Sequence, residues 1–385
     1  MTGPPSAQDR LADIAAFASK SVAPAAIGWS MGAPVSAELF AQAARLGLMG
    51  VEVSAASGGL GADFAFKVTA CAHLAAADFG FAMSVVNTHN VARRIELSAA
   101  APLKARHLPD LLSGRVSACT ALTEPGAGSD VPALATLAER VPGGWRLNGE
   151  KTWIINGRHA GLCIVYARCG AADSGGIGAF LVDLTAPGVT RYPLDGPFAQ
   201  TSMGTGGFRL EDVMVEDDQL LLSPDIAFKA ILSEINGART YVAAMCCAML
   251  EAAIGEVSAH GARRRTFGIP LEAHQDWRLT VARARVDLAA AQALVDRAVG
   301  AAGDAGAAQM QAAAAKVHAV ETGQRHLPRL LHAMGAEGLR PEHCLARHLG
   351  ALQSAALTDG STAMLLERIA RLGRRSAPSD IQEKA

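Results

Sequence analysis

The sequence lacks an excess of charge of either sign, because 35 lysine and arginine residues face 36 aspartate and glutamate residues and leave a net charge of −1. A balance of this kind argues against a nucleic-acid partner or an anionic membrane surface. The uncharged run Thr240–Leu250 is too short for a membrane span, which needs about 20 residues. The first ten residues contain no apolar core typical of a signal peptide. We therefore expect a cytoplasmic protein that does not insert into a membrane.

Cysteine pairs of the kind that bind zinc are also missing, since none of the seven cysteines forms a CxxC motif. Their odd number and irregular spacing favour buried thiols in a reducing compartment, and we expect no metal site. The chain does have length and apolar residues: 385 residues, of which 50% are hydrophobic and 18% charged. This composition is typical of a folded protein with two or three domains.

Residues 1–117 form the first predicted domain, which is helical. Apolar residues recur there at three- and four-residue spacing, with a glycine-rich loop at Ser57–Gly61. We expect His89 and Asn90, in its last part, to be buried and hydrogen-bonded rather than catalytic. The predicted helical segments are Leu11–Phe17, Leu39–Leu48, Phe64–Asp78 and Phe81–Ile95.

Residues 118–224 form a second predicted domain, in which short strands alternate with turn residues. The pair Asn148-Gly149, between alternating residues, predicts a β-hairpin with a type I′ turn. The glycine-rich run Gly204–Gly207 leads into a strand rather than a helix, so we interpret it as a turn and not as a phosphate loop. Together these signals predict a small antiparallel barrel or sandwich. The further predicted strands are Cys163–Ala167, Gly178–Val182, Val189–Tyr192 and Phe208–Val215.

Residues 225–385 form a third predicted domain of long, alanine-rich helices joined by short loops, which is typical of a four-helix bundle. We expect Pro328 to kink or break the third of these helices. The fold class is therefore multidomain α+β, with helices, then strands, then helices. The predicted helices are Ala227–His260, Leu279–Val299, Ala307–Met334 and Cys344–Ile369.

The junction between the first two domains carries the loop Ala121–Asp130, with the sequence Ala-Leu-Thr-Glu-Pro-Gly-Ala-Gly-Ser-Asp. Its glycines let main-chain N–H groups approach a ligand closely, because glycine has no Cβ. Thr123 and Ser129 add hydroxyl groups on either side. Such a loop can surround the polar edge of a flat ring or an anion. A surface turn between two domains is the alternative interpretation.

The segment Thr123–Asp130 resembles the signature of the flavin-dependent acyl-CoA dehydrogenase family, and further motifs of that family follow in the same order along nearly the whole chain. The resemblance implies that family's fold: an N-terminal helical domain, a middle β domain and a C-terminal four-helix bundle. It also implies FAD as cofactor and a dimer of dimers. The other matching motifs are Asn148–Lys151 with Trp153-Ile154, Arg264–Gly268, His274-Gln275, Met334-Gly335 and Asp359–Ser361.

By this resemblance, one group of residues would contact FAD within the chain and a second would contact the FAD of a neighbouring subunit. Without it, Arg264 and Arg265 read as a basic cluster at a helix end, favoured by the helix dipole. Their guanidinium groups also suit pyrophosphate oxygens. The first group is Thr120, Ala121, Leu122, Thr123, Gly128, Ser129, Trp153 and Ile155, with Ser361 and Ala363 on the adenine half. The second group is Arg264, Arg265, Thr266, Phe267, Gln275, His332, Gly335 and Ala336.

The resemblance also implies a catalytic base and a set of thioester contacts. Asp359 stands where the family has glutamate, and the family's alternative position for the base is Ala238 here. Aspartate is one methylene shorter, a loss of about 1 Å in reach, and a shift of that size can change a rate about 100-fold. The aspartate also resembles nitroalkane oxidases, which share the fold. The implied substrate contacts are Ser129, Asn236, Arg239 and Gly360.

Three functions stay open at this point. The first is an acyl-CoA or acyl-carrier-protein dehydrogenase of fatty acid or secondary metabolism, which passes electrons to an electron-transfer flavoprotein. The second is an oxidase or specialised tailoring enzyme of the same fold. The third is a non-catalytic subunit of a heteromer, in place of a homodimer or homotetramer.

Overall fold

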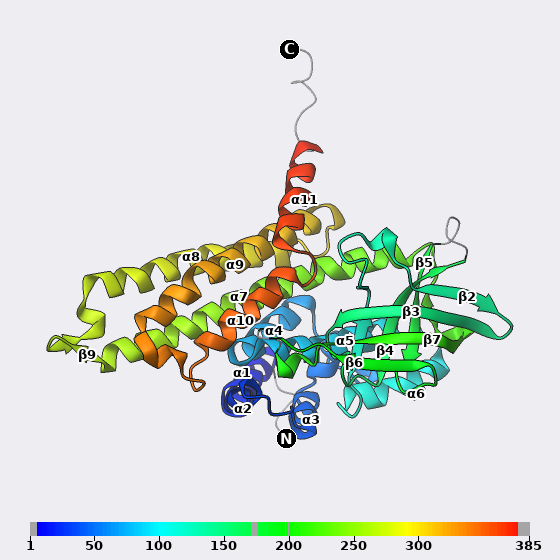
Figure 1. Ribbon diagram of the computed structural model, residues 1–385, viewed down its shortest axis with the longest axis horizontal. Helices are drawn as coiled ribbons and strands as arrows, with labels where there is room; N and C mark the ends of the chain where they lie inside the picture. Colours follow the sequence, from blue (N-terminus) through cyan, green and yellow to red (C-terminus); the bar gives the residue numbers. More distant parts are fainter. Residues whose placement is uncertain (1–5, 171–175, 197, 199, 376–385) are drawn as a thin grey trace, which may run out of the picture.

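Helices and strands occupy the chain in three blocks, with helices first, then strands, then helices (Figure 1). The structure is a computed structural model, which describes residues 6–170, 176–196, 198 and 200–375. The predicted α+β fold class is confirmed. In Figure 1 the long helices of the third block extend to one side, the sheet lies at the other, and the first helices lie beneath both.

The first block is helical because apolar residues are spaced at helical intervals and polar residues cap the helix starts. Ser6, Asp63 and Asp78 each accept a hydrogen bond from a main-chain N–H in the first turn of the helix that follows. A π-helical turn, Ala18–Val22, joins the first two helices. The helices are α1 (Ala7–Phe17), α2 (Ala23–Ser30), α3 (Ala37–Arg45), α4 (Phe64–Ala77), α5 (Phe79–Ser98) and α6 (Ala101–Leu112).

The second block is one eight-stranded sheet with the order β6-β7-β3-β2-β4-β5-β8, and β1 pairs with β4. Most neighbours are antiparallel, as predicted, but β4 is parallel to both β1 and β2, so the purely antiparallel expectation is wrong there. The strands are β1 (Ala118–Ala121), β2 (Leu137–Val141), β3 (Gly144–Ile154), β4 (Leu162–Cys169), β5 (Ile177–Asp183), β6 (Val189–Pro193), β7 (Gly206–Glu216) and β8 (Leu220–Leu222).

The hairpin predicted at Asn148-Gly149 is wrong, because β3 runs through both residues. The pair lies at a bulge against β7, where the Asn148 amide exchanges hydrogen bonds of 2.9 and 3.0 Å with Asp212. Gly149 is required there, since a Cβ would lie 2.6 Å from the Thr136 hydroxyl. The turn into β3 is instead at residues 142–143, where Gly143 has φ +85°. Tertiary pairing with β7 therefore overrides the local turn signal.

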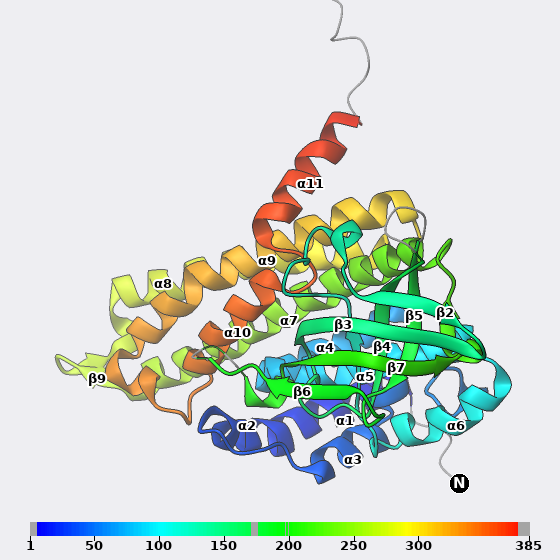
Figure 2. The ribbon, with the colours of Figure 1, turned by 45° about the vertical axis from the view of Figure 1, so that its right-hand side comes forward.

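The third block is a bundle around α7, which packs against α8, α9 and α10 (Figure 2). By length and composition α7 could cross a membrane, but 61% of its apolar window is buried, as in the core helix of a soluble protein. The helix α9 continues through Pro328. The helices are α7 (Ala227–Arg263), α8 (Gln275–Gly300), α9 (Ala305–Ala333), α10 (Leu345–Leu357) and α11 (Thr362–Arg375), with a small hairpin of β9 (Arg265–Thr266) and β10 (Ile269–Pro270).

The single helix predicted over Cys344–Ile369 is wrong, because α10 ends at Leu357 and α11 starts at Thr362. Between them Asp359 and Gly360 have φ values of +55° and +106°, which no helix accommodates. From this break α11 leaves the bundle at a steep angle in both views (Figures 1 and 2).

One apolar core runs from the first block into the bundle, because α4 packs against both α5 and α7. A second core lies between the sheet, α5 and α6, and includes Ala227 and Ile231 at the start of α7. A third lies within the sheet. The seven cysteines are all buried and free. The start of α7 therefore touches the strand domain, while the rest of the helix forms the centre of the bundle.

Candidate active site

The loop after β1 is closed by its own main chain. Glu124 and Ala127 exchange main-chain hydrogen bonds of 2.8 and 3.2 Å around Pro125 and Gly126, which are exposed. The Thr152 N–H donates to the Thr123 carbonyl at 3.1 Å, which joins the loop to the end of β3. The turn residues and the strand pairing thus give the loop a fixed shape.

A buried ion pair between Glu124 and Lys151 anchors this loop. Lys151 is fully buried, and its Nζ donates to Glu124 Oε1 at 2.7 Å and to the Leu122 carbonyl at 3.2 Å. The other donors to the carboxylate are the N–H groups of Ala135, at 2.6 Å, and Thr136, at 3.0 Å. Burial opposes ionisation of Glu124, but Lys151 and these donors outweigh it and lower the pKa of Glu124.

The sequence interpretation missed this ion pair. The sequence did carry a signal for it. Lys151 lies in a predicted strand segment among residues that face the core, and Glu124 is an acidic residue in the preceding loop that could neutralise it. Both ends of the loop are held. The Glu124 carboxylate binds the N–H groups of Ala135 and Thr136 after the loop, and Lys151 binds the carbonyl of Leu122 near its start. The predicted cofactor residues Thr120–Ser129 therefore lie on a rigid segment.

The outer face of the loop is open and has groups that suit a flat ring with polar edges. A side chain placed at Gly128 would find Thr123 Cγ2 at 4.0 Å as its nearest neighbour. The N–H groups of Gly128 and Ser129 have no acceptor among the residues that the structure describes. Trp153, at the end of β3, has φ +58° and is 65% exposed. These residues fit the isoalloxazine ring of a flavin, with the indole as an apolar surface.

Asn156 fixes the backbone that carries Trp153 and Ile155. It is fully buried, has φ +63°, and donates from Nδ2 to the carbonyls of Ser84 and Ala118 at 2.9 Å each. The segment is thereby fastened to α5 and to the start of β1. Ile155 packs against the core of the helical domains, whereas Trp153 remains exposed.

The break between α10 and α11 holds Asp359 through its main chain. Arg239 Nε donates to the Asp359 carbonyl at 2.9 Å, and Lys316 Nζ donates to the Gly360 carbonyl at 2.7 Å and to the Thr358 carbonyl. Arg239 lies on α7 and Lys316 on α9, and both are buried. Two cations from neighbouring helices thus bind three consecutive carbonyls.

The Asp359 carboxyl has no hydrogen-bond donor among the described residues, although two cations lie nearby. Burial of the carboxyl raises its pKa above the ordinary value, and the charges of Lys316 and Arg239 only partly oppose this. A desolvated carboxylate without donors is a stronger base than a solvated one. The carboxyl therefore has the properties that a general base needs at neutral pH.

Three of the four predicted substrate contacts meet at this break. Arg239 Nη1 donates to Asn236 Oδ1 at 2.8 Å, and Arg239 Nη2 lies 3.5 Å from the position of a Cβ on Gly360. Arg239 Nη2 has no acceptor among the described residues. Ser129, the fourth, is exposed on its loop. That loop reaches the same helix, because Leu134 and Val131 pack in one core with Ile231 and Ile235 of α7.

The second group of predicted cofactor residues lies at the far end of the bundle. Arg264 follows Arg263, the last residue of α7, which lies 24 residues beyond Arg239, or about 36 Å along a helix. Figure 1 shows β9 at the end of the molecule opposite the sheet. One chain therefore does not bring the two groups together.

This far end is exposed and apolar at its tip. Phe267 is 98% exposed on the turn of the β9–β10 hairpin, with φ +50°. Thr266 Oγ1 lies 2.9 Å from His274 Nε2 and Arg265 Nη2 donates to the Gly268 carbonyl at 2.6 Å, so the hairpin is ordered by its own contacts. The remaining predicted residues of this group are also exposed: Gln275, His332, Gly335 and Ala336.

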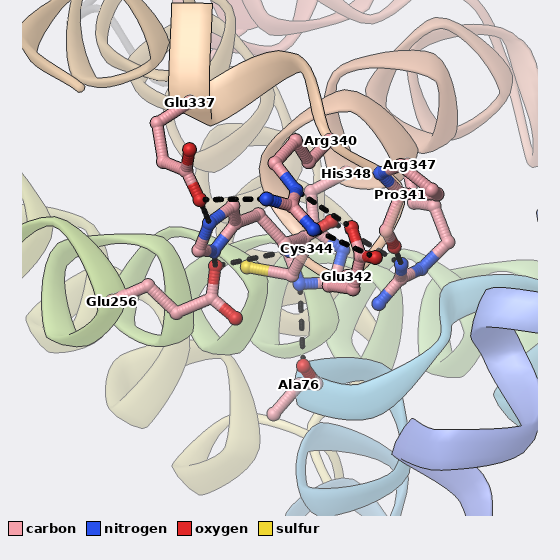
Figure 3. A network of polar contacts seen from close by, with 10 residues as sticks. Ala76, Glu256, Glu337, Arg340, Pro341, Glu342, Cys344, Arg347 and His348 are labelled. Carbon is pink, nitrogen blue, oxygen red and sulfur yellow. Dashed lines mark hydrogen bonds and ion pairs between the residues drawn. The ribbon is translucent and has the colours of Figure 1, made fainter. Parts of the chain in front are cut away.

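A polar network holds the segment between α9 and α10 in place (Figure 3). Glu256 of α7 accepts from the Cys344 N–H at 3.0 Å and lies 3.4 Å from His343, whose other nitrogen lies 3.4 Å from Glu337. Below it, His348 bonds the Ala76 carbonyl at 3.2 Å, and burial lowers the pKa of His348 to about 3. The network fixes the chain that follows Gly335 and Ala336.

The two residues predicted for the adenine half lie at the start of α11. Ser361 caps this helix, since its Oγ accepts from the Met364 N–H at 3.3 Å, and Ala363 is exposed. His89 and Asn90 are buried or partly buried in the first block, where each has a hydrogen-bond partner. Among the described residues, no group of three or more His, Cys, Asp or Glu side chains is placed to hold a metal.

Comparison with known proteins gives matches to one family along the whole chain. The N-terminal, middle and C-terminal domain models of acyl-CoA dehydrogenase match residues 5–115, 119–213 and 228–373. The probable acyl-CoA dehydrogenase YngJ of Bacillus subtilis (strain 168) is 29% identical over 365 residues, which cover 92% of this chain and 94% of that protein.

Two further matches differ in how much they cover. Acyl-CoA dehydrogenase AFT10-1 of Alternaria alternata is 31% identical over 193 residues, 50% of this chain and 44% of that protein. A solved glutaryl-CoA dehydrogenase from Mycobacterium smegmatis, in complex with FADH2, is 26% identical and has a TM-score of 0.89. That alignment covers 97% of this chain and 95% of the other.

Proposed function

Because the chain belongs to the acyl-CoA dehydrogenase family, we propose that it introduces an α,β double bond into an acyl thioester. Family membership makes the protein an oxidoreductase with FAD as its cofactor. The thioester carrier is CoA or an acyl carrier protein, and the electron acceptor is an electron-transfer flavoprotein.

The observation that carries the proposal is the Asp359 carboxyl, which is half-buried beside two cations and has no donor among the described residues. Such a carboxylate takes the α-proton of the acyl thioester, whose acidity is raised when donors bind the thioester carbonyl. The electron pair left on the α-carbon forms the double bond as the β-hydrogen departs. When bound, FAD supplies the acceptor for that hydride.

Arg239 has one donor group left for the substrate. Its Nε and Nη1 are used by Asp359 and Asn236, whereas Nη2 has no acceptor in the described part of the chain and faces Gly360. Burial lowers the pKa of Arg239 to about 10, so the guanidinium stays charged at neutral pH. We infer that this N–H orients a polar group of the acyl thioester beside Asp359.

The cofactor is held by two chains in this proposal. The loop 120–129 and Trp153 of one chain would contact the flavin, with the N–H groups of Gly128 and Ser129 as donors. The exposed residues Arg264–Phe267 of a second chain would contact the pyrophosphate. The separation of these groups within one chain supports a homodimer or homotetramer.

The experiment is an anaerobic titration of the FAD-loaded protein with butyryl-CoA, octanoyl-CoA and glutaryl-CoA, followed by the flavin absorbance. We expect at least one of them to bleach the flavin without air, and turnover in air with an electron-transfer flavoprotein to release little hydrogen peroxide. Peroxide as the main product would indicate an oxidase. A purified protein that binds no FAD would contradict the proposal.

The variant Asp359→Asn tests the base in the same titration. We expect FAD content to stay unchanged and the rate of flavin reduction to fall by about 10²–10⁴-fold, which is the usual contribution of a general base. Asp13→Asn, an exposed aspartate on α1, is the matched control and should leave the rate unchanged. An Asp359→Asn protein that is reduced as fast as the unchanged one would show that another group takes the proton.

A further inference from the structure

The break between α10 and α11 presents three carbonyls in a row without helical partners. A helix leaves its last carbonyls unsatisfied, and these oxygens carry the negative end of the helix dipole. Here the Thr358 and Gly360 carbonyls both accept from Lys316 Nζ, and the carbonyl between them accepts from Arg239. One ammonium group thus bridges the carbonyls of the residues before and after Asp359.

Lys316 is an unusual residue for its position on α9. It is 1% exposed, and the residues around it on the helix are buried and apolar: Ala312, Ala313, Ala315, Val317, Ala319 and Val320. Burying an ammonium group is unfavourable before any compensation, and an apolar side chain of similar volume is often as stabilising. Stability alone therefore does not account for a lysine here.

Aspartate tolerates the left-handed region better than most residues, but its surroundings still have to hold it in that conformation. Asp359 has φ +55° and Gly360 φ +106°. Lys316 binds the carbonyls of Thr358 and Gly360, which precede and follow that of Asp359, so reorientation of either carbonyl breaks one of its hydrogen bonds. Together with Arg239, which binds the Asp359 carbonyl, it constrains the direction of the Asp359 Cα–Cβ bond.

We propose that Lys316 is a positioning residue, which fixes the left-handed turn at Asp359 so that the carboxyl stays free of donors and directed at the substrate. This inference rests on the proposed role of Asp359 as the base. Lys316 acts through the two carbonyls and does not bond the carboxyl. Burial lowers the pKa of Lys316 to about 8, with the charge of Asp359 opposing that shift, so the ammonium form persists at neutral pH.

The proposal predicts a local and a chemical effect of Lys316→Met. Without the ammonium, the turn loses both hydrogen bonds, and hydrogen exchange of the amides from Asp359 to Leu365 should become at least tenfold faster. The limiting rate of flavin reduction by saturating octanoyl-CoA or butyryl-CoA should fall by about 100-fold, as expected for a base displaced by about 1 Å. The acyl-CoA concentration for half-maximal reduction should change less than threefold.

Two further variants separate positioning from folding. Lys316→Arg keeps the charge and the donors and should restore at least a tenth of the rate. Thr322→Val changes another buried polar residue of α9, whose hydroxyl has no partner among the described residues, and should leave both measurements unchanged. The acid limb of the pH–rate profile should move to higher pH in Lys316→Met, because a positive charge near the carboxyl is removed.

The outcomes distinguish this proposal from the proposed function. Faster exchange with a slower rate supports the positioning role, and an unchanged rate or unchanged exchange in Lys316→Met overturns it. If Asp359→Asn retains full activity while Lys316→Met accelerates exchange, the role of Asp359 fails although Lys316 still holds the turn. A loss of rate in Thr322→Val equal to that in Lys316→Met would also overturn the proposal, since any disturbance of α9 would then suffice.

Discussion

The break at Asp359 is hydrogen-bonded to Arg239 of α7, and the hairpin at Phe267 follows the end of the same helix. The two regions differ in how their geometry is fixed. At the break, buried groups from α7 and α9 bind three main-chain carbonyls. At the hairpin, the contacts are local, and Phe267 is 98% exposed. The first region takes its shape from distant parts of the same chain, whereas the second takes its shape from neighbours in sequence.

This difference explains why the two regions need different tests. A buried charge that loses its partner is costly, so variants near the loop and the break should change the free energy of unfolding. An exposed aromatic side chain contributes little to folding and is typical of a contact with another molecule. If the comparison is right, variants of the first kind change stability, and variants of the second kind change assembly.

The largest effect is expected at the Glu124–Lys151 pair, which holds the loop beside Trp153. In Lys151→Met the Glu124 carboxylate stays buried without its cation, so the free energy of unfolding should fall by about 3–5 kcal/mol. Urea unfolding followed by circular dichroism measures this change. The protein should also lose FAD on gel filtration, because the loop is no longer anchored at Leu122.

The control for that prediction is an exposed ion pair on the same sheet. Arg209 Nε lies 3.2 Å from Glu150 Oε2, and the two side chains are 56% and 31% exposed. Arg209→Met should cost less than about 1 kcal/mol. Equal losses in the two variants would mean that burial does not distinguish these pairs, and would break the comparison.

A smaller effect is expected from His89, which is buried between Glu52, Lys67 and Arg93. Burial, with Lys67 and Arg93, holds the pKa of His89 at about 4, although Glu52 opposes the shift. Between about pH 6.5 and 4 the unfolded chain binds a proton that the folded chain does not, so the free energy of unfolding should fall as the pH falls through this window. The loss attributable to His89 is at most about 3 kcal/mol.

Urea unfolding at a series of pH values measures this slope, and His89→Phe should reduce it between pH 6.5 and 4, while the contribution of His348 remains. Below pH 4.5 a further loss is expected in the unchanged protein and a smaller one in His89→Phe, since His89 and Lys67 hold the pKa of Glu52 at about 2 despite burial. His332→Phe, in the exposed region, is the control and should follow the unchanged protein. A slope in His89→Phe equal to that of the unchanged protein would assign the acid sensitivity to other groups.

The order of helices and strands could be predicted because hydrophobic spacing is a local property. The long helix α7 and the strands β4 to β7 follow their patterns closely. Two local signals failed for the same reason. Asn148-Gly149 reads as a turn, but pairing with β7 keeps it in a strand, and the apolar spacing of Cys344–Ile369 continues across Thr358–Ser361, where the helix breaks.

The candidate site likewise contains some residues that the sequence predicted and others that it did not. Motifs placed Asn236, Arg239, Asp359 and Gly360 in one predicted site, and the structure brings these four together. Their catalytic and binding roles remain predictions. Lys316 and the Glu124–Lys151 pair were missed, because each acts on main-chain groups 11 or more residues away, and no spacing rule identifies such a contact.

The smallest effect on folding is expected at the hairpin, and it is the most direct test of the comparison. Phe267→Ser removes a side chain that is 98% exposed, so the free energy of unfolding of the chain should change by less than about 0.5 kcal/mol. Light scattering after gel filtration should nevertheless show a smaller particle, with less FAD per chain, because the hairpin would contact a second subunit and its cofactor. Met31→Ser, also highly exposed at 76%, should change neither quantity. If Phe267→Ser keeps its particle size and its FAD, the hairpin is an ordinary surface turn, and the second chain has no part in the site.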